Sequence, residues 1–242
     1  YIETFERACA ASLAWPENKE AIKGANWNIV CDEKSAERVN EIRLRCGVTR
    51  GKNIFLHAGQ HPTFQFSGHL YEEMSACIRE DATFLFALPD YVFGDGTIAN
   101  LKAMMIEKGL CLAVPNTRVL PSAMEEFKRP LTNAELVTIA FDRTYMHQTW
   151  RDAEFGKATS DTYYGGVLWK EIRPGLITVM HRLPSSYMCN FLPEDIEFFK
   201  KQLSFSAWDH VWPTALLEQG RQRFIGSSDV AFITEITEAN RN

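Results

Sequence analysis

The chain has 242 residues, of which 45% are hydrophobic and 24% charged, a composition typical of globular proteins and unlike that of disordered or collagenous chains. Its 26 lysine and arginine residues stand against 31 aspartate and glutamate residues, which gives a net charge of −5 with no basic stripe along the chain. This balance argues against nucleic acid as a partner, because phosphate binding depends on clustered basic residues. Length and composition together predict a single α/β domain over residues 1–242.

The first half of the sequence alternates between helical and strand patterns. Apolar side chains recur at helical spacing in one set of segments, and short apolar runs lie between them. The predicted helices are 3–14, 36–45, 67–80 and 97–108, and the predicted strands are 26–31, 53–57, 83–88 and 111–114. The run at 83–88 is continuously apolar, as in a strand buried on both faces. This alternation predicts βαβ units and a mostly parallel, Rossmann-like sheet flanked by helices.

The second half predicts mixed strands and longer loops. A polar stretch at 145–164 has no clear period. The predicted helices are 132–143, 193–203 and 213–218, and the predicted strands are 166–169, 176–180, 223–225 and 231–236. A parallel front half with a loop-rich back half is typical of α/β folds in which one half binds a nucleotide and the other shapes a second site.

The spacing of the cysteines and the length of the apolar runs indicate the cellular compartment that we expect for this protein. The six cysteines are widely spaced, form no CxxC pair and lie within apolar patterns, which predicts reduced core thiols. We find no apolar run of about 18 residues and no basic leader followed by an apolar segment. We therefore expect a cytoplasmic protein with no membrane span.

The segment from Phe86 to Thr97 carries the most informative carboxylates. Asp90 and Asp95 follow the apolar run and precede the start of a helix that Thr97 is expected to cap. Ligands of open parallel sheets bind at the carboxyl ends of strands, where a carboxylate can hold a divalent metal against a diphosphate. From the residues alone, Asp90 is equally a turn residue, and Asp95-Gly96 a tight turn before the helix.

The same segment resembles a known family. Leu88-Pro89-Asp90-Tyr91-Val92-Phe93, Asp95-Gly96 and the helix 97–108 are similar to the central segment of GT-A fold glycosyltransferases. That superfamily uses an Asp-x-Asp motif to bind a nucleotide-sugar diphosphate through a metal, and here Leu88 stands in place of the first acid. The resemblance implies donor binding by Asp90, Asp95 and Gly96. It also implies a Mn²⁺ or Mg²⁺ cofactor held by Asp90 and by His181, for which a purely structural role is the alternative.

Residues near the start of the chain and in its second half extend the resemblance to GT-A fold glycosyltransferases. Residues 1–22 look like the first helix of such enzymes, which implies that their first strand lies upstream of residue 1, with 1–120 as the nucleotide-sugar half and 121–242 as the acceptor half. The stretch 205–210 resembles the site of the catalytic base of inverting members and assigns that role to Asp209, with helix capping as the alternative. His147 and Asp229 are the acceptor-side candidates, and Asp229 also fits a simple turn after Ser227-Ser228.

Other motifs are weaker. His57 and His61 have the spacing of a helical zinc pair, but Gly59 and Pro62 predict a loop there. The sequence therefore predicts a glycosyltransferase that moves a sugar from a nucleotide-sugar donor to an acceptor hydroxyl. A sugar-phosphate nucleotidyltransferase and a non-catalytic binding domain on the same fold remain the alternatives.

Overall fold

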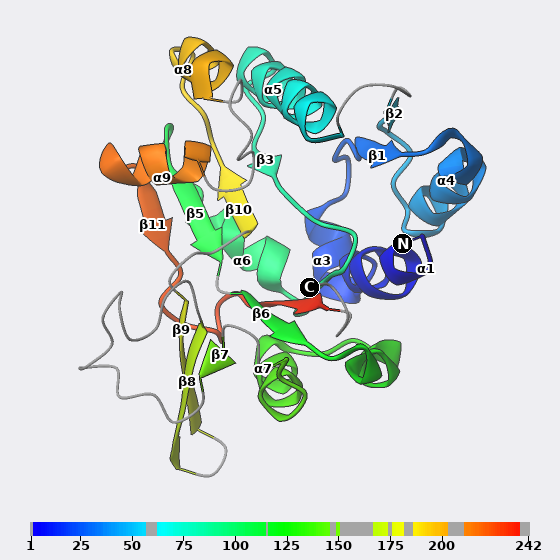
Figure 1. Cartoon of the computed structure of the whole chain (residues 1–242), viewed down its shortest axis with the longest axis vertical. Coiled ribbons are helices and arrows are strands. Elements are labelled where there is room, and N and C mark those ends of the chain that lie inside the picture. The colour runs from blue at the N-terminus through cyan, green and yellow to red at the C-terminus, as the bar shows by residue number, and fades with distance from the viewer. Residues whose placement is uncertain are drawn as a thin grey trace.

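The computed structural model describes residues 2–56, 62–114, 116–145, 149–150, 167–173, 176–181, 186–202 and 211–237 (Figure 1). Helices and strands alternate along most of these ranges. The helical elements are α1 (Ile2–Thr4), η1 (Phe5–Ala10), α2 (Ala11–Leu13), α3 (Pro16–Ala21), η2 (Glu33–Ser35), α4 (Ala36–Arg45), α5 (Pro62–Arg79), α6 (Thr97–Met104), η3 (Pro121–Lys128), α7 (Asn133–Asp142), α8 (Asp195–Gln202) and α9 (Val211–Glu218). The protein is therefore of the α/β class, as predicted.

The strands are short and form several small sheets within the described ranges. They are β1 (Ile29–Cys31), β2 (Asn53–Phe55), β3 (Phe84–Leu85), β4 (Tyr91–Phe93), β5 (Cys111–Val114), β6 (Asn116–Val119), β7 (Thr149–Trp150), β8 (Val167–Arg173), β9 (Leu176–His181), β10 (Ser186–Cys189), β11 (Gln222–Phe224) and β12 (Ile233–Ile236). The strand orders are β1-β2, β11-β5-β10-β3, β4-β12-β6 and β7-β8-β9.

The strand pairing does not confirm a mostly parallel, Rossmann-like sheet. β5 pairs in parallel with β11, but β10 inserts antiparallel between β5 and β3. β12 pairs in parallel with β6 and antiparallel with β4. Antiparallel strands thus occur in the front half as well as in the back half. The cause is long-range pairing, because β10 and β12 come from the last quarter of the chain.

The apolar run at 83–88 differs from the expected buried strand. Only Phe84 and Leu85 form a strand, and both are half-buried, while Phe86 is buried and Ala87 is exposed. A turn follows, and the fully buried strand is β4, whose three residues each have an exposed fraction of 0%. The run therefore predicted a strand at the correct place, but β3 is shorter and less buried than expected, and the separate buried strand β4 was not predicted.

Three apolar clusters form most of the core. One contains Tyr91 and Leu101 and lies between β4, β5 and the helices α2 and α6. A second lies on the other face of the β4–β12–β6 sheet and contains Leu136 of α7 and Trp169 of β8. The third contains Phe199 and joins α8 to α5 and β10. The β4–β12–β6 sheet therefore sits between two apolar clusters.

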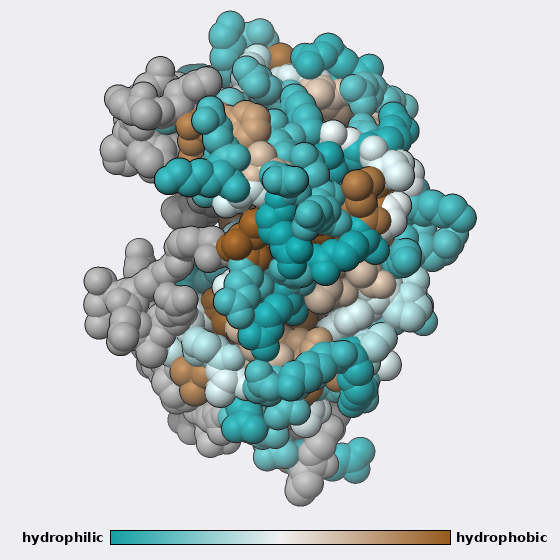
Figure 2. All heavy atoms as spheres, turned by 90° about the vertical axis from the view of Figure 1, so that its right-hand side faces the viewer, coloured by the Kyte–Doolittle hydropathy of each residue, from teal (hydrophilic) through white to brown (hydrophobic). Residues whose placement is uncertain are grey.

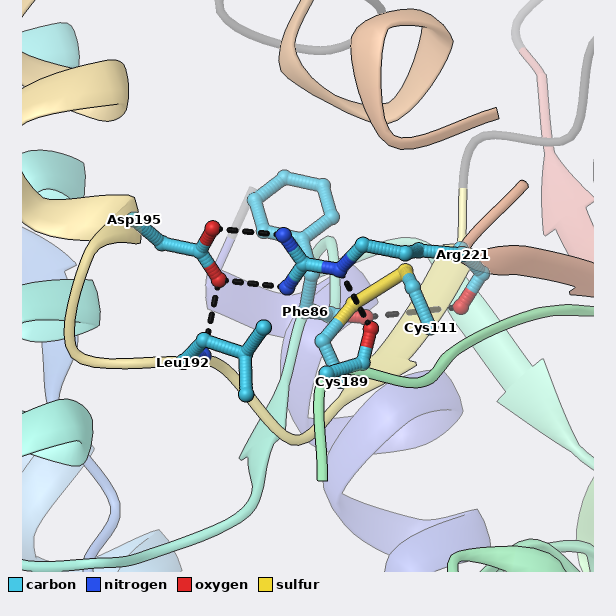
Figure 3. The surroundings of a disulfide bond; sticks show 8 residues. Phe86, Cys111, Cys189, Leu192, Asp195 and Arg221 are labelled. Carbon is cyan, nitrogen blue, oxygen red and sulfur yellow. Dashed lines mark hydrogen bonds and ion pairs between the residues drawn. A yellow bond between two sulfur atoms is a disulfide. The ribbon is translucent and has the colours of Figure 1, made fainter. Parts of the chain in front are cut away.

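A disulfide corrects the prediction that all six cysteines are reduced. Cys111 of β5 and Cys189 of β10 lie directly opposite each other and are joined by a bond between their Sγ atoms. Beside them, Arg221 forms two hydrogen bonds of 2.6 Å with Asp195 and donates to Gly109 O at 2.9 Å (Figure 3). Four described cysteines are free thiols. Because the disulfide is favoured by oxidising compartments, the cysteines no longer support a cytoplasmic location.

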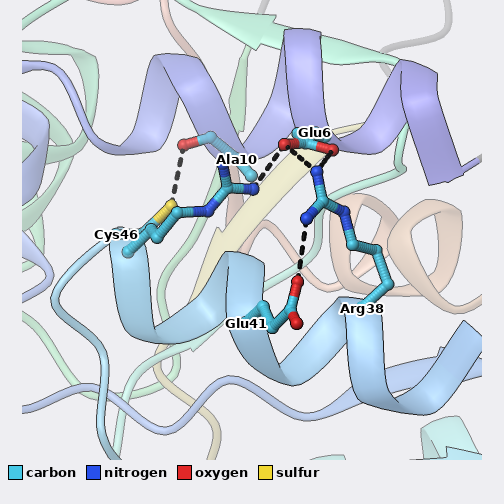
Figure 4. A network of polar contacts seen from close by, with 6 residues as sticks. Glu6, Ala10, Arg38, Glu41 and Cys46 are labelled. Atoms are coloured by element: carbon cyan, nitrogen blue, oxygen red, sulfur yellow. Dashed lines mark hydrogen bonds and ion pairs between the residues drawn. The ribbon is translucent and has the colours of Figure 1, made fainter.

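Polar contacts hold α4 against the first helical segment. The Glu6 carboxylate accepts hydrogen bonds from Arg38 and Arg45, and Arg38 also binds Glu41 (Figure 4). The Cys46 thiol donates to Ala10 O at 3.3 Å in the same interface. These ion pairs are solvent-exposed, so each contributes at most about 1 kcal/mol. They orient α4 and leave the apolar contacts beneath them to supply most of the stability.

The outer surface shows no large apolar region on the face beside α4. Figure 2 shows this face as mainly hydrophilic, with apolar residues in a few small areas. Within the described part of the chain, no helix is long and apolar enough to cross a membrane.

Candidate functional site

Asp90 lies at an end of the β4–β12–β6 sheet. Because β4 is antiparallel to β12, and β12 is parallel to β6, the start of β4 lies beside the carboxyl ends of the other two strands. The backbone confirms this position, since Ile236 N donates to Asp90 O at 2.9 Å. Carboxyl ends of parallel strands are the usual place for ligands in α/β proteins. Asp90 lies at such a place. It directly precedes β4, whereas the sequence predicted that it would follow a buried strand.

The local sequence fixes the backbone of Asp90. Leu88, Pro89, Asp90 and Tyr91 form a turn closed by a hydrogen bond from Tyr91 N to Leu88 O at 3.2 Å. Proline presets the dihedral angle that the second residue of such a turn requires. The fully buried β4 then anchors the turn from the other side. The carboxyl group is thus held on a rigid turn.

Burial and charge raise the proton affinity of Asp90. Its side chain is mostly buried, and its Oδ1 atom is inaccessible to solvent without a hydrogen-bond partner. Burial first, and the Glu235 carboxylate second, raise the pKa of Asp90 to about 6; a hydrogen bond with the backbone of Asp90 itself, and then the Arg118 guanidinium, oppose this rise. A carboxyl group with such a pKa and an unused oxygen is a candidate for ligand binding.

Glu235 and Arg118 complete the charged neighbourhood. Glu235 of β12 and Arg118 of β6 lie opposite each other in the parallel pairing of these strands, and Arg118 Nε lies 3.2 Å from Glu235 Oε1. The Glu235 side chain is 14% exposed, whereas that of Arg118 is 41% exposed and reaches the surface. Sequence reasoning missed both residues, because they lie far from Asp90 in the chain and belong to no local motif. Only the pairing of β12 with β4 and β6 brings them together.

Asp95 occupies the other end of β4 and has a defined structural contact. Its Oδ1 accepts hydrogen bonds from Glu17 N at 3.0 Å and Asn18 N at 3.2 Å, at the start of α3. In return, Asn18 Oδ1 accepts from Ile98 N at 3.0 Å, at the start of α6. Asp95, which lies just before α6, thus accepts from free N–H groups at the start of α3, and Asn18 of α3 does the same for the start of α6. Gly96, which precedes α6 with a φ of 89°, takes the cap position expected of Thr97.

Asp229 lies near the Asp95 end of the sheet. Its side chain is exposed, and its backbone oxygen accepts from Asn133 Nδ2 at 3.3 Å. Asn133 also accepts a 2.7 Å hydrogen bond from Thr97 Oγ1, beside Asp95 and Gly96. The structure therefore gathers Asp95, Gly96 and Asp229 at one end of β4 and places Asp90 at the opposite end. It does not bring the two predicted donor-binding acids together.

The remaining candidates are described only in part. Asp209 and His147 lie outside the described residues, as do His57 and His61. His181 ends β9, in a separate sheet that pairs β9 with β8. Among the residues that the structure describes, no group of three or more His, Cys, Asp or Glu side chains could hold a metal ion. A metal bound by Asp90 and His181 therefore stays a prediction.

Comparison with known proteins adds no family. The sequence matches no family model, and no curated protein is significantly similar to it.

Proposed function

We propose that this chain is a GT-A-like glycosyltransferase domain that binds a nucleotide-sugar donor at the Asp90 end of the β4–β12–β6 sheet. The observation that carries the proposal is the mostly buried Asp90 carboxyl, with an unpartnered Oδ1, at the carboxyl ends of β6 and β12. The proposal is supported further by the resemblance of Leu88–Phe93 and Asp95-Gly96 to the central GT-A segment.

Each residue at this end has a chemical role in the proposal. Asp90 accepts hydrogen bonds from hydroxyl groups of the donor, which need an acceptor once they leave water. Arg118 is the cation at the surface of the site and pairs with the donor diphosphate, for which a guanidinium has matching geometry. Glu235 holds Arg118 in place from the neighbouring strand.

The proposed divalent metal keeps Asp90 and His181 as its ligands, and Glu235 adds a carboxylate of the kind that Mg²⁺ and Mn²⁺ prefer. Within the described part of the chain, no three such side chains come together. When bound, the metal would neutralise charge on the diphosphate leaving group. Asp209 remains the proposed catalytic base, and His147 and Asp229 the proposed acceptor-side residues. The geometry favours Asp90 over Asp95 and Gly96 for the donor, because the latter two lie at the other end of β4.

Thermal shift measurements test donor binding. UDP-, GDP- and CMP-sugars, each with and without Mn²⁺, should raise the melting temperature of the protein in a concentration-dependent way for at least one donor. Asp90→Asn should abolish that rise, while Asp142→Asn, a matched change on an exposed residue of α7, should keep it. The absence of a rise with every donor would overturn the proposal.

Product analysis separates the alternatives. A glycosyltransferase releases free nucleotide from the nucleotide sugar in the presence of acceptor. Release of pyrophosphate from a nucleoside triphosphate and a sugar phosphate would indicate a nucleotidyltransferase. Donor binding without any product, for a broad acceptor panel, would indicate a binding domain.

A further inference from the structure

The disulfide between Cys111 and Cys189 is inaccessible in the folded protein. Both cysteines have an exposed fraction of 0%, and both belong to the apolar cluster that contains Phe86 and Phe199. A thiol that reduces a disulfide must reach one of the two sulfur atoms, because the exchange proceeds by direct attack of a thiolate on sulfur. Reduction of this disulfide therefore requires part of the structure to open first.

The ion pair of Arg221 and Asp195 is a second link at the same place. The Arg221 guanidinium donates two hydrogen bonds of 2.6 Å, one to each carboxylate oxygen of Asp195. The pair is itself largely enclosed, with side-chain exposures of 17% for Arg221 and 3% for Asp195. Two parallel bonds between charged groups are strong, and a buried carboxylate that loses its arginine is costly. The ion pair should therefore open rarely.

The ion pair connects the segments on both sides of the disulfide. On one side, Cys111 N donates to Arg221 O at 2.9 Å, and Arg221 Nε donates to Gly109 O at 2.9 Å. On the other side, Asp195 belongs to the segment that follows β10, and its carboxylate accepts from Leu192 N at 2.8 Å. Figure 3 shows the Arg221 side chain extending past the disulfide toward Asp195. The ion pair thus spans the end of β5 and β10 at which the disulfide lies.

The loops around the ion pair are closely packed. Gly109 has a φ of 79°, and a Cβ atom at this position would lie 3.1 Å from the Leu192 side chain and 3.2 Å from Arg221 Nε. Both distances are shorter than ordinary van der Waals contact, so glycine allows the loops to meet here. This close packing indicates that the ion pair and the loops open together.

We propose that the Arg221–Asp195 ion pair is a gate that controls thiol–disulfide exchange at Cys111 and Cys189. With the gate closed, the disulfide persists in the presence of a thiol. With the gate open, one thiolate of a dithiol reductant attacks a sulfur atom and breaks the S–S bond, which gives a mixed disulfide and one cysteine thiolate. The second thiolate of the reductant then displaces the other cysteine. The reductant leaves as a cyclic disulfide, and its two protons end on the two cysteine thiols.

The rate of reduction by dithiothreitol provides the first test. After acid quenching and alkylation in denaturant, mass spectrometry distinguishes the oxidised chain, with four labelled cysteines, from the reduced chain, with six. Arg221→Met removes the gate and should raise the rate roughly ten- to a hundredfold, because hydrogen bonds to a charged group are lost. Arg223→Met is the matched control two positions along the chain. Arg223 pairs with the exposed Glu107 at 3.0 Å, and its loss should leave the rate unchanged.

Urea separates a local gate from global unfolding. The urea dependence of a rate grows with the surface that is exposed in the opening step. Reduction through the gate should depend only weakly on urea below the unfolding transition, in wild type and in Arg221→Met. A wild-type rate with the full urea dependence of global unfolding would overturn the proposal, because the disulfide would then be reached only from the unfolded chain. Equal rates in wild type and Arg221→Met, or equal acceleration in Arg223→Met, would also overturn it.

Discussion

Replacing Asp90 with asparagine should stabilise the protein at neutral pH. Asparagine has nearly the same shape and carries no charge at any pH. The folded protein keeps the proton on Asp90 up to its pKa of about 6, whereas an unfolded aspartate loses it near pH 4. Asp90 therefore lowers the free energy of unfolding as pH rises from about 4 to about 6, and the loss is complete above that range.

The size of the effect follows from the pKa. Burial and Glu235 raise the pKa of Asp90 from 3.8 to about 6. At about 1.4 kcal/mol for each tenfold change in proton affinity, this corresponds to about 3 kcal/mol. Because the side chain is not fully buried, solvent screening reduces the expected gain in Asp90→Asn to about 2 kcal/mol. For a chain of this length, that is a rise in melting temperature of about 4–8 °C.

Urea denaturation between pH 3.5 and pH 8 measures the effect. The free energies of unfolding of wild type and Asp90→Asn should coincide below about pH 4, diverge up to about pH 6 and stay apart above it. In Glu235→Gln, loss of the neighbouring carboxylate should move the divergence to lower pH. Equal stability of wild type and Asp90→Asn at pH 7, or a difference that grows toward acid, would refute the reasoning.

Three further changes test polar contacts at the Asp95 end of the sheet and elsewhere in the fold. Asp95→Ala removes the acceptor for α3 and should lower the free energy of unfolding by about 1–2 kcal/mol, whereas Asp95→Asn should recover most of it in the same melts. Arg221→Met leaves the buried Asp195 carboxylate without its partner and should cost about 3–5 kcal/mol, seen as a lower urea midpoint; Asp195→Leu in the same chain should restore part of the loss. Hydrogen bonds from Arg129 first, and from the backbone of Thr132 second, lower the pKa of Glu135 to about 2. Glu135→Gln should therefore be the less stable protein at pH 7, by under about 1 kcal/mol, with a difference that is complete above about pH 4.5 and vanishes toward pH 2.

Much of the secondary structure follows from local patterns. The predicted helix 36–45 coincides with α4, the predicted strand 111–114 with β5, and the predicted helix 132–143 is within a residue of α7 at either end. α4 and α7 have helical apolar periods, α7 also begins with a capping box, and β5 is a short, continuously buried apolar run. The mixed sheet order could not be predicted in the same way. β6 and β10 have only four residues each, and their neighbours are decided by contacts across most of the chain.

The site was predictable at one residue and hidden at the others. Asp90 was chosen because it follows an apolar run and precedes the start of a helix, and in the structure it lies at the start of the buried strand β4. Arg118 and Glu235 gave no signal, because a single charged residue in a short strand is indistinguishable from a solvent-facing one. Asp95 was visible as a carboxylate before a helix, but its partner is the start of α3, more than seventy residues earlier. A local motif can reveal a cap and cannot tell which helix it caps.

The contacts of Asp90 and Asp95 make their roles separable by experiment. The two acids flank the same three-residue strand, yet burial makes the Asp90 carboxylate a cost to stability, and two backbone hydrogen bonds make the Asp95 carboxylate a gain. Groups that lower the stability of the fold are common at functional sites. If the donor binds at the Asp90 end, Asp90→Asn should yield a more stable protein that no longer responds to the donor. Loss of the donor response in Asp95→Asn alone, with the fold intact, would move the site to the other end of β4.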